Sequence, residues 1–149
     1  MNIKKLAKYI AIPLVVGFLG NLLGGNTDIY SKINTPAFAP PAILFPIVWS
    51  ILYILMGISS YIISNKKNNN TALTVYYIQL GVNALWSLFF FRFNFFLFSA
   101  LWLALLIILV IYMIVLFYKL DKTAAFLQIP YLAWIIFAFV LNFSIYLLN

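Results

Sequence analysis

The sequence predicts an all-α membrane protein: a five-transmembrane-helix bundle with a long loop between the first and second helices. Hydrophobic residues make up 66% of the chain, charged residues make up 7%, and the mean hydropathy is +1.10. These values are typical of integral membrane proteins and not of soluble domains. A chain of 149 residues has room for about five spans of roughly 20 residues each. We therefore expect a single membrane domain over residues 1–149.

Apolar runs of spanning length define the five helices. A continuous apolar stretch around Arg92-Phe93-Asn94 is too long for one bilayer crossing, so the arginine and asparagine indicate a tight hairpin there. Three lysines precede the first run, as in a signal peptide, but no cleavage site is obvious, and we expect the first helix to be retained. The expected helices cover residues 3–23, 41–64, 72–91, 95–118 and 124–148.

The longest connection runs from about residue 24 to residue 40 and is rich in glycine, proline and short polar residues. Pro40 and Pro41 suit an extended entry followed by a first helical turn. A loop of this length over a compact bundle is often a lid. A surface connection that only joins two helix ends is the alternative.

The distribution of positive charge predicts the orientation in the membrane. If the spans alternate, one side receives seven of the nine basic residues and the other side receives Lys32 and Arg92. The positive-inside rule then predicts a multi-pass protein of a bacterial-type cell membrane with a cytoplasmic N-terminus and an outer C-terminus. The net charge of +7 is explained by this topology and by anionic lipid headgroups, so no nucleic-acid partner is expected. The seven residues are Lys4, Lys5, Lys8, Lys66, Lys67, Lys119 and Lys122.

Missing residue types exclude several kinds of chemistry. The chain contains no cysteine and no histidine, so no metal site is expected. Asp28 and Asp121 are its only acids, and both fall in expected loops. No carboxylate is therefore available inside the membrane for a proton relay or for ion-coupled transport. No hydrolytic triad, catalytic carboxylate pair or phosphate-binding loop can be assembled.

Three of the expected spans carry aromatic and amide side chains at helical spacing. An unpaired amide in an apolar environment costs several kcal/mol, so such groups face a partner helix or a ligand. For the two asparagines an interhelical hydrogen bond is the alternative to ligand binding, and packing is the alternative for Trp86. The three stripes are Trp49 and Tyr53; Gln79, Asn83, Trp86 and Phe90; and Trp134, Ala138 and Asn142.

The stripes lie in three longer blocks. These are PAFAPPAILFPIVWSILYILMG at residues 36–57, QLGVNALWSLFF at residues 79–90 and PYLAWIIFAFVLN at residues 130–142. Together they resemble the signature blocks of the TspO/MBR family, the tryptophan-rich sensory proteins related to the mitochondrial translocator protein or peripheral benzodiazepine receptor. The order of the blocks, the length of the chain, the five expected helices and the long first loop all agree with this resemblance.

The resemblance implies a bundle, usually dimeric, that binds a porphyrin such as protoporphyrin IX in a pocket beneath the first loop. It implies a function in stress or tetrapyrrole regulation, with light- and oxygen-dependent degradation of the porphyrin in some members. The alternative is a carrier or transporter of porphyrins or other lipophilic small molecules. No cofactor is required, because the porphyrin is itself the ligand or substrate. The expected partners are this small molecule, the lipid bilayer and a second copy of the chain.

The resemblance also implies the site residues. Trp49 and Trp134 would offer aromatic faces to the macrocycle and would be the catalytic residues if photodegradation occurs. From the acidic groups of a porphyrin, and not from the resemblance, we expect Lys32 or nearby loop amides to meet the propionates. The full expected set of ligand-binding residues is Pro40, Pro41, Trp49, Tyr53, Asn83, Trp86, Trp134, Ala138 and Asn142.

The chain departs from the family pattern at two places. Ile29-Tyr30 stands where members commonly have a Trp-Tyr pair, and Thr35 replaces a lysine before Pro36. The basic residue of the cholesterol-recognition pattern is absent from residues 141–149, so we expect poor sterol binding.

Small residues suggest where helices approach closely. Gly20 and Gly24 form one pair, while Gly81, Ala84 and Ser87 give the third span a second small face. The family resemblance favours the third span as the dimer interface. Packing within one monomer is the alternative for both faces.

Overall fold

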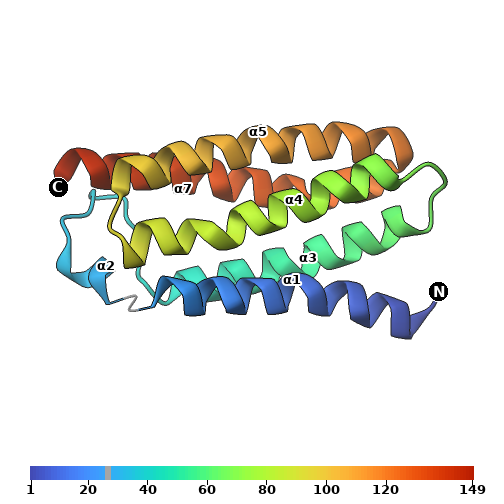
Figure 1. Ribbon diagram of the computed structural model, residues 1–149, viewed down its shortest axis with the longest axis horizontal. Helices are drawn as coiled ribbons and strands as arrows, with labels where there is room; N and C mark the ends of the chain where they lie inside the picture. The colour runs from blue at the N-terminus through green and yellow to red at the C-terminus, as the bar shows by residue number, and fades with distance from the viewer. Residues whose placement is uncertain (26–27) are drawn as a thin grey trace.

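A computed structural model describes residues 1–25 and 28–149, and the regular elements of this described part are all helices (Figure 1). Five segments are long and apolar enough to cross a membrane, which confirms the expected fold class. A single turn, α2 (Ile29–Lys32), lies in the first loop, whose residues 26–27 are outside the described part. The spans are α1 (Ile3–Gly24); α3 (Leu44–Ser64); α4 (Asn70–Ser87) with the π-helical turn η1 (Leu88–Arg92); α5 (Phe96–Leu120); and α6 (Lys122–Leu127) with α7 (Ile129–Leu148).

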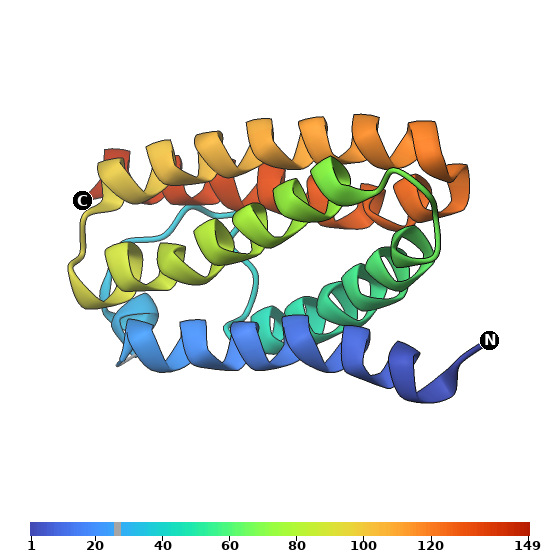
Figure 2. The ribbon, with the colours of Figure 1, turned by 45° about the vertical axis from the view of Figure 1, so that its right-hand side comes forward.

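Each spanning helix of the bundle packs against two or more of the others. α1 packs against α3 and α4, and α5 packs against α4 and α7, while α6 closes the bundle against α3. Figure 2 shows α4 running between α1 and α5. The N-terminus and the α3–α4 connection share one end of the bundle, whereas α2 and the C-terminus share the other (Figure 1). We call these the lysine end and the loop end.

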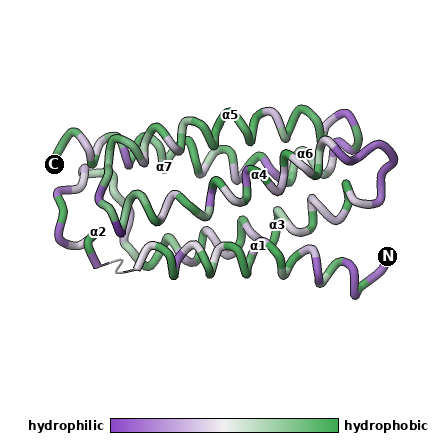
Figure 3. Tube along the Cα trace, in the orientation of Figure 1, coloured by the Kyte–Doolittle hydropathy of each residue, from purple (hydrophilic) through white to green (hydrophobic). Residues whose placement is uncertain are grey.

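The seven lysines that the sequence assigned to one side all belong to segments at the lysine end. Hydrophilic residues are conspicuous there, at the start of α1 and in the α3–α4 connection (Figure 3). Lys66 in that connection forms an ion pair with Asp121, with 3.0 Å between Nζ and Oδ2. Since Asp121 also accepts a hydrogen bond from the backbone N–H of Ala124, it joins two connections and caps α6.

Two features of the helices differ from the sequence expectation, and one agrees with it. α3 begins at Leu44, because the bond from the Leu44 N–H to the Pro41 carbonyl closes a tight turn before the helix. The last span breaks at Gln128, since Pro130 has no N–H to donate and lies in the first turn of α7, a position that suits proline. The expected hairpin is present: Asn94 has a φ of 55°, and the Phe95 N–H donates to the Phe89 carbonyl.

Small residues allow the helices to approach closely within the monomer. A Cβ atom on Gly20 would lie 3.0 Å from the Ala84 carbonyl oxygen, and one on Gly24 would lie 3.1 Å from Ser87 Cβ. The small residues of α1 and two of those on α4 therefore face each other inside one chain, as the monomer alternative predicted. Gly81 differs, because a Cβ atom there would meet nothing within 4 Å.

The two halves of the bundle differ in packing. Towards the lysine end, large side chains from α3, α5 and α7 are fully enclosed and form the main hydrophobic core. Met56, Ile63, Met113 and Phe117 have no exposed surface. Towards the loop end the helices enclose a cavity instead.

Candidate functional site

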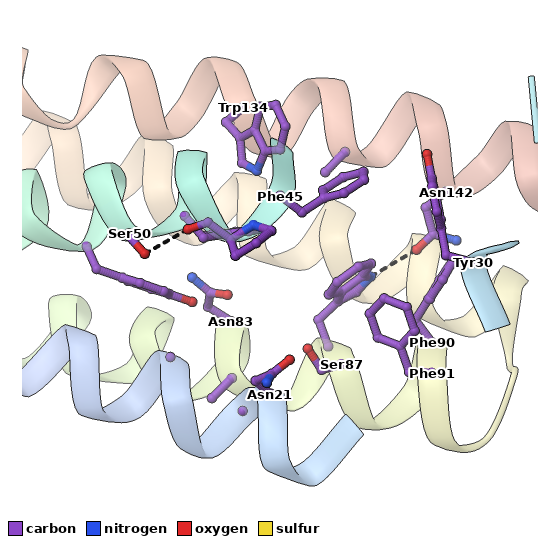
Figure 4. A pocket seen from close by; sticks show the side chains of 18 of the residues that line it. Asn21, Tyr30, Phe45, Ser50, Asn83, Ser87, Phe90, Phe91, Trp134 and Asn142 are labelled. Carbon is purple, nitrogen blue, oxygen red and sulfur yellow. Dashed lines mark hydrogen bonds between the residues drawn. The ribbon is translucent and has the colours of Figure 1, made fainter. Parts of the chain in front are cut away.

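The cavity in the loop half has a volume of about 680 Å³. Its walls come from α1, α3, α4, η1, α5 and α7, and Tyr30 of α2 reaches it from the loop. Figure 4 shows the side chains converging, with Trp134 and Asn142 on α7, Asn83 and Ser87 on α4, and Asn21 on α1. Helices that are distant in sequence therefore build one site.

Aromatic side chains from α3 and α7 form one wall. The ring of Trp49 stacks on Tyr53, with centroids 5.5 Å apart and 26° between the planes. Trp49 also meets Trp134 edge-on at 6.4 Å and 88°, and Tyr131 edge-on at 6.2 Å. Offset and edge-to-face contacts of this kind favour fixed ring positions. The two tryptophans that the sequence singled out are therefore direct neighbours.

Asn142 of α7 lines the cavity and forms hydrogen bonds to other helices of the bundle. Its Oδ1 accepts a hydrogen bond from Trp86 Nε1 at 2.9 Å, and its Nδ2 donates to the Phe96 carbonyl at 2.8 Å. Trp86 stacks on Phe90, with ring centroids 5.1 Å apart. The interhelical bond foreseen as an alternative for Asn142 is present, while the residue also lines the cavity.

Asn83 also lines the cavity and belongs to a second network of hydrogen bonds. Its Nδ2 donates to Tyr131 Oη at 3.0 Å, and this hydroxyl donates to Gln79 Oε1 at 2.7 Å. All three side chains are buried. The network ties α4 to α7, so the interhelical alternative holds for Asn83 as well. Sequence reasoning identified Gln79 but missed Tyr131, although the tyrosine lies within a signature block.

Trp134 is held by packing. Its indole N–H is enclosed and has no acceptor among the described residues. Phe45 and Phe137 contact its ring, with centroids 5.8 Å and 5.4 Å away. The orientation of this tryptophan therefore depends on its aromatic neighbours.

Seven of the nine expected ligand-binding residues line the cavity: Trp49, Tyr53, Asn83, Trp86, Trp134, Ala138 and Asn142. Pro40 and Pro41 do not line it in the described structure. The Pro40 carbonyl instead accepts a hydrogen bond from Tyr30 Oη at 2.9 Å, and Ala42 and Ile43 form the adjacent wall. The loop thus contributes to the site through Tyr30, Ala42 and Ile43.

Sequence reasoning missed the wall formed by α1. Gly17, Phe18 and Asn21 line the cavity, but α1 contains no signature block that would draw attention to them. Phe18 is 62% exposed, and Asn21, like Ser50 on the facing α3, is also exposed. The cavity therefore opens sideways between α1 and α3, towards the surface that lipid would cover.

The first loop is fastened to the end of α7. The Asn34 N–H donates to Asn149 Oδ1 at 3.1 Å, and Asn149 Nδ2 donates to the Asn34 carbonyl at 2.8 Å. These bonds hold the loop over the bundle end beside the cavity. Its position and the lining side chain of Tyr30 fit the lid interpretation.

The electrostatic character of the cavity is neutral. No charged side chain appears among its described lining residues, and these consist of aromatic, aliphatic and small residues with a few amides and hydroxyls. The described part of the chain contains no group of three or more residues of the types that commonly hold a metal. The uncharged lining is therefore suited to an uncharged and largely apolar part of a ligand.

Comparisons with known proteins agree with this architecture. Residues 9–148 match the sequence profile of the TspO/MBR family. The chain is 40% identical to a tryptophan-rich protein TspO from Archaeoglobus fulgidus, covering 100% of this chain and 99% of the relative. It is 36% identical to the protein CrtK of Rhodobacter capsulatus, covering 100% and 95%. It is 30% identical to the translocator protein of Sus scrofa, covering 93% and 86%.

Proposed function

Because the chain belongs to the TspO/MBR family, we propose that this multi-pass membrane protein binds a tetrapyrrole of the protoporphyrin IX type in the loop-half cavity. We place the function in stress or tetrapyrrole regulation. The observation that carries the proposal is the convergence of conspicuous residues from α3, α4 and α7 on a single aromatic, uncharged cavity.

The size and the walls of the cavity support this ligand class. A volume of about 680 Å³ falls within the range of about 300–1,000 Å³ that small-molecule sites occupy. A porphyrin ring is flat and largely apolar, so it needs aromatic faces and few polar partners. Trp49, Tyr53 and Trp134 supply such faces. Because Asn83 and Asn142 already bond across the bundle, they stiffen the walls as well as line them.

The neighbouring tryptophans support a photochemical step. Light excites the bound porphyrin, and one electron passes from it to O₂, which yields superoxide and a porphyrin radical cation. The indole of Trp49 or Trp134 can donate the electron that reaches O₂ by way of the excited ring and then regain one electron from the porphyrin. Superoxide adds to the porphyrin radical cation, which joins O₂ to the macrocycle and restores the indole, so no acid or base is required. The 6.4 Å between the two indole rings allows radical character to pass from one to the other. The protein then acts by confinement and electron donation.

The packing of the bundle favours this reading over the carrier reading. The cavity lies in the loop half, while the half at the lysine end is filled by enclosed side chains such as Met56, Met113 and Phe117. A carrier needs access from both sides, which would require a second conformation with that core opened. The described conformation suits binding and reaction at one site.

We also propose a cytoplasmic lysine end and a homodimer. The seven lysines at one end agree with the positive-inside rule. The exposed Gly81 on α4 lies beside open space, so a second copy could approach closely there.

The test is to titrate detergent-purified protein with protoporphyrin IX in the dark, follow tryptophan quenching, and then illuminate the complex while its absorption spectrum is recorded. Wild type should bind saturably and produce a new absorbing species. The Trp49→Phe/Trp134→Phe variant should keep most of the binding and lose this conversion. Trp102→Phe is the matched control, because Trp102 bonds to the Val82 carbonyl and does not line the cavity.

The outcomes separate the parts of the proposal. Conversion by the double variant at the wild-type rate would remove the tryptophans from the reaction. Bleaching no different from that of free porphyrin would leave binding without catalysis. Absence of saturable binding would overturn the proposed function.

A further inference from the structure

The cavity is uncharged, but two cations lie at the same end of the bundle. Lys32 and Arg92 are the two basic residues of the described loop end, and both are exposed. Asp28 is the acid at that end. A ligand that carries carboxylates therefore finds no positive partner inside the cavity, and the two cations of the loop end are the candidates outside it.

Arg92 ends η1 and contacts the end of α1. Its neighbour Phe91 lines the cavity. Its Nε donates to the Leu23 carbonyl at 2.7 Å, so the guanidinium lies against the last turn of α1, which also contains the lining residue Asn21. A Cβ atom on Gly25 would lie 3.3 Å from Nη2. The Nε bond uses one of the five N–H donors of arginine, which leaves the terminal N–H groups for other acceptors.

Lys32 lies in the first loop at the same end of the bundle. It belongs to α2, the same helical turn as Tyr30, and Tyr30 lines the cavity while its hydroxyl donates to the Pro40 carbonyl. The two cations therefore belong to two different segments, and each is within two residues in sequence of a residue that lines the cavity.

We propose that Arg92 and Lys32 form a carboxylate-binding rim, and that the site selects flat apolar ligands bearing acidic groups at one edge. This inference rests on the proposed tetrapyrrole function. Burying a carboxylate in the uncharged cavity would carry a large desolvation cost, so the acids stay at the rim while the ring enters. Arginine suits this position because its planar guanidinium can bind a carboxylate with two parallel hydrogen bonds.

The test compares protoporphyrin IX, which has two carboxylates, with its dimethyl ester, which has none. Dark titrations of wild type, Arg92→Gln, Lys32→Gln and the double variant give an affinity for each ligand. Each single change should weaken binding of the diacid by about two- to fivefold, and the double change by about tenfold. Binding of the ester should stay unchanged, and the preference of wild type for the diacid should shrink as salt is added.

Two further variants test whether the effect depends on positive charge at the loop end. Lys67→Gln removes an exposed cation from the lysine end and should leave both affinities unchanged. Arg92→Lys keeps the charge and should retain most of the preference for the diacid. If the double variant binds diacid and ester in the wild-type ratio, the rim is refuted while the proposed function stands. If wild type binds neither ligand saturably, the proposed function and the rim both fall.

Discussion

Gly57→Ala should destabilise the bundle, because α1 and α3 touch at this glycine. A methyl group there would collide with the Cα of Ile10, and would lie 2.7 Å from the Tyr9 carbonyl oxygen and 3.0 Å from Ile10 Cγ1. Two of these neighbours are backbone atoms, so the helices must separate by about 1 Å to restore ordinary contact. Overpacking costs about 1–3 kcal/mol, and the better helix propensity of alanine offsets about 1 kcal/mol at most. We expect a net loss of about 1–2 kcal/mol.

Thermal unfolding in detergent, followed by circular dichroism, measures this effect. For a chain of this size the expected loss corresponds to a fall in Tm of about 2–8 °C. Gly81→Ala is the matched control in the monomeric protein: it makes the same change within α4, where nothing in the same chain lies within 4 Å of the new methyl group, and should not lower the Tm of the monomer. If Gly57→Ala unfolds at the same temperature as Gly81→Ala or above it, α1 does not pack on α3 as closely as described.

Three other changes test the polar contacts. Tyr131→Phe leaves Gln79 Oε1 without its donor and should cost about 1–3 kcal/mol of stability; an unchanged melting curve would contradict the network. Gln128→Leu should stabilise the fold by about 1 kcal/mol or more, because both polar atoms of the Gln128 side chain are buried without a described partner; a lower Tm would show that they are paired. The hydrogen bond from Lys66 holds the pKa of Asp121 below its ordinary value. The stability that Asp121 contributes is therefore present above the ordinary carboxyl pKa and lost as pH falls through the lowered one. Asp121→Asn should flatten this acid limb in a pH series, and an equally steep limb would refute the pairing.

The predicted fold agrees with the structure wherever it depends on local hydrophobicity. The five spans and the hairpin at residues 92–94 follow from apolar runs and the polar residues that interrupt them. The errors lie at helix ends. Pro41 was expected to start a helix that begins at Leu44, and the break at Gln128 was not foreseen. Both depend on how turn bonds close around a proline, which hydropathy does not report.

The candidate site could be predicted in part. Trp49, Asn83 and Trp134 were singled out because polar and aromatic groups in an apolar span need a partner, and all three line the cavity. The contribution of α1 could not be predicted, because Phe18 and Asn21 look like ordinary residues of a membrane helix. The structure adds them to the site.

The sequence by itself determined that this protein is a five-span membrane bundle, which segments cross the bilayer and where the positive charge lies. Transfer of an apolar run into lipid depends on the composition of that run alone, so these properties are local. Tertiary structure decided that Gly20 faces Ala84 within one chain, that Tyr131 joins the two amides of α4, and that the cavity opens beside α1. These features depend on the rotation and separation of packed helices, since a contact between distant segments exists only when both are positioned.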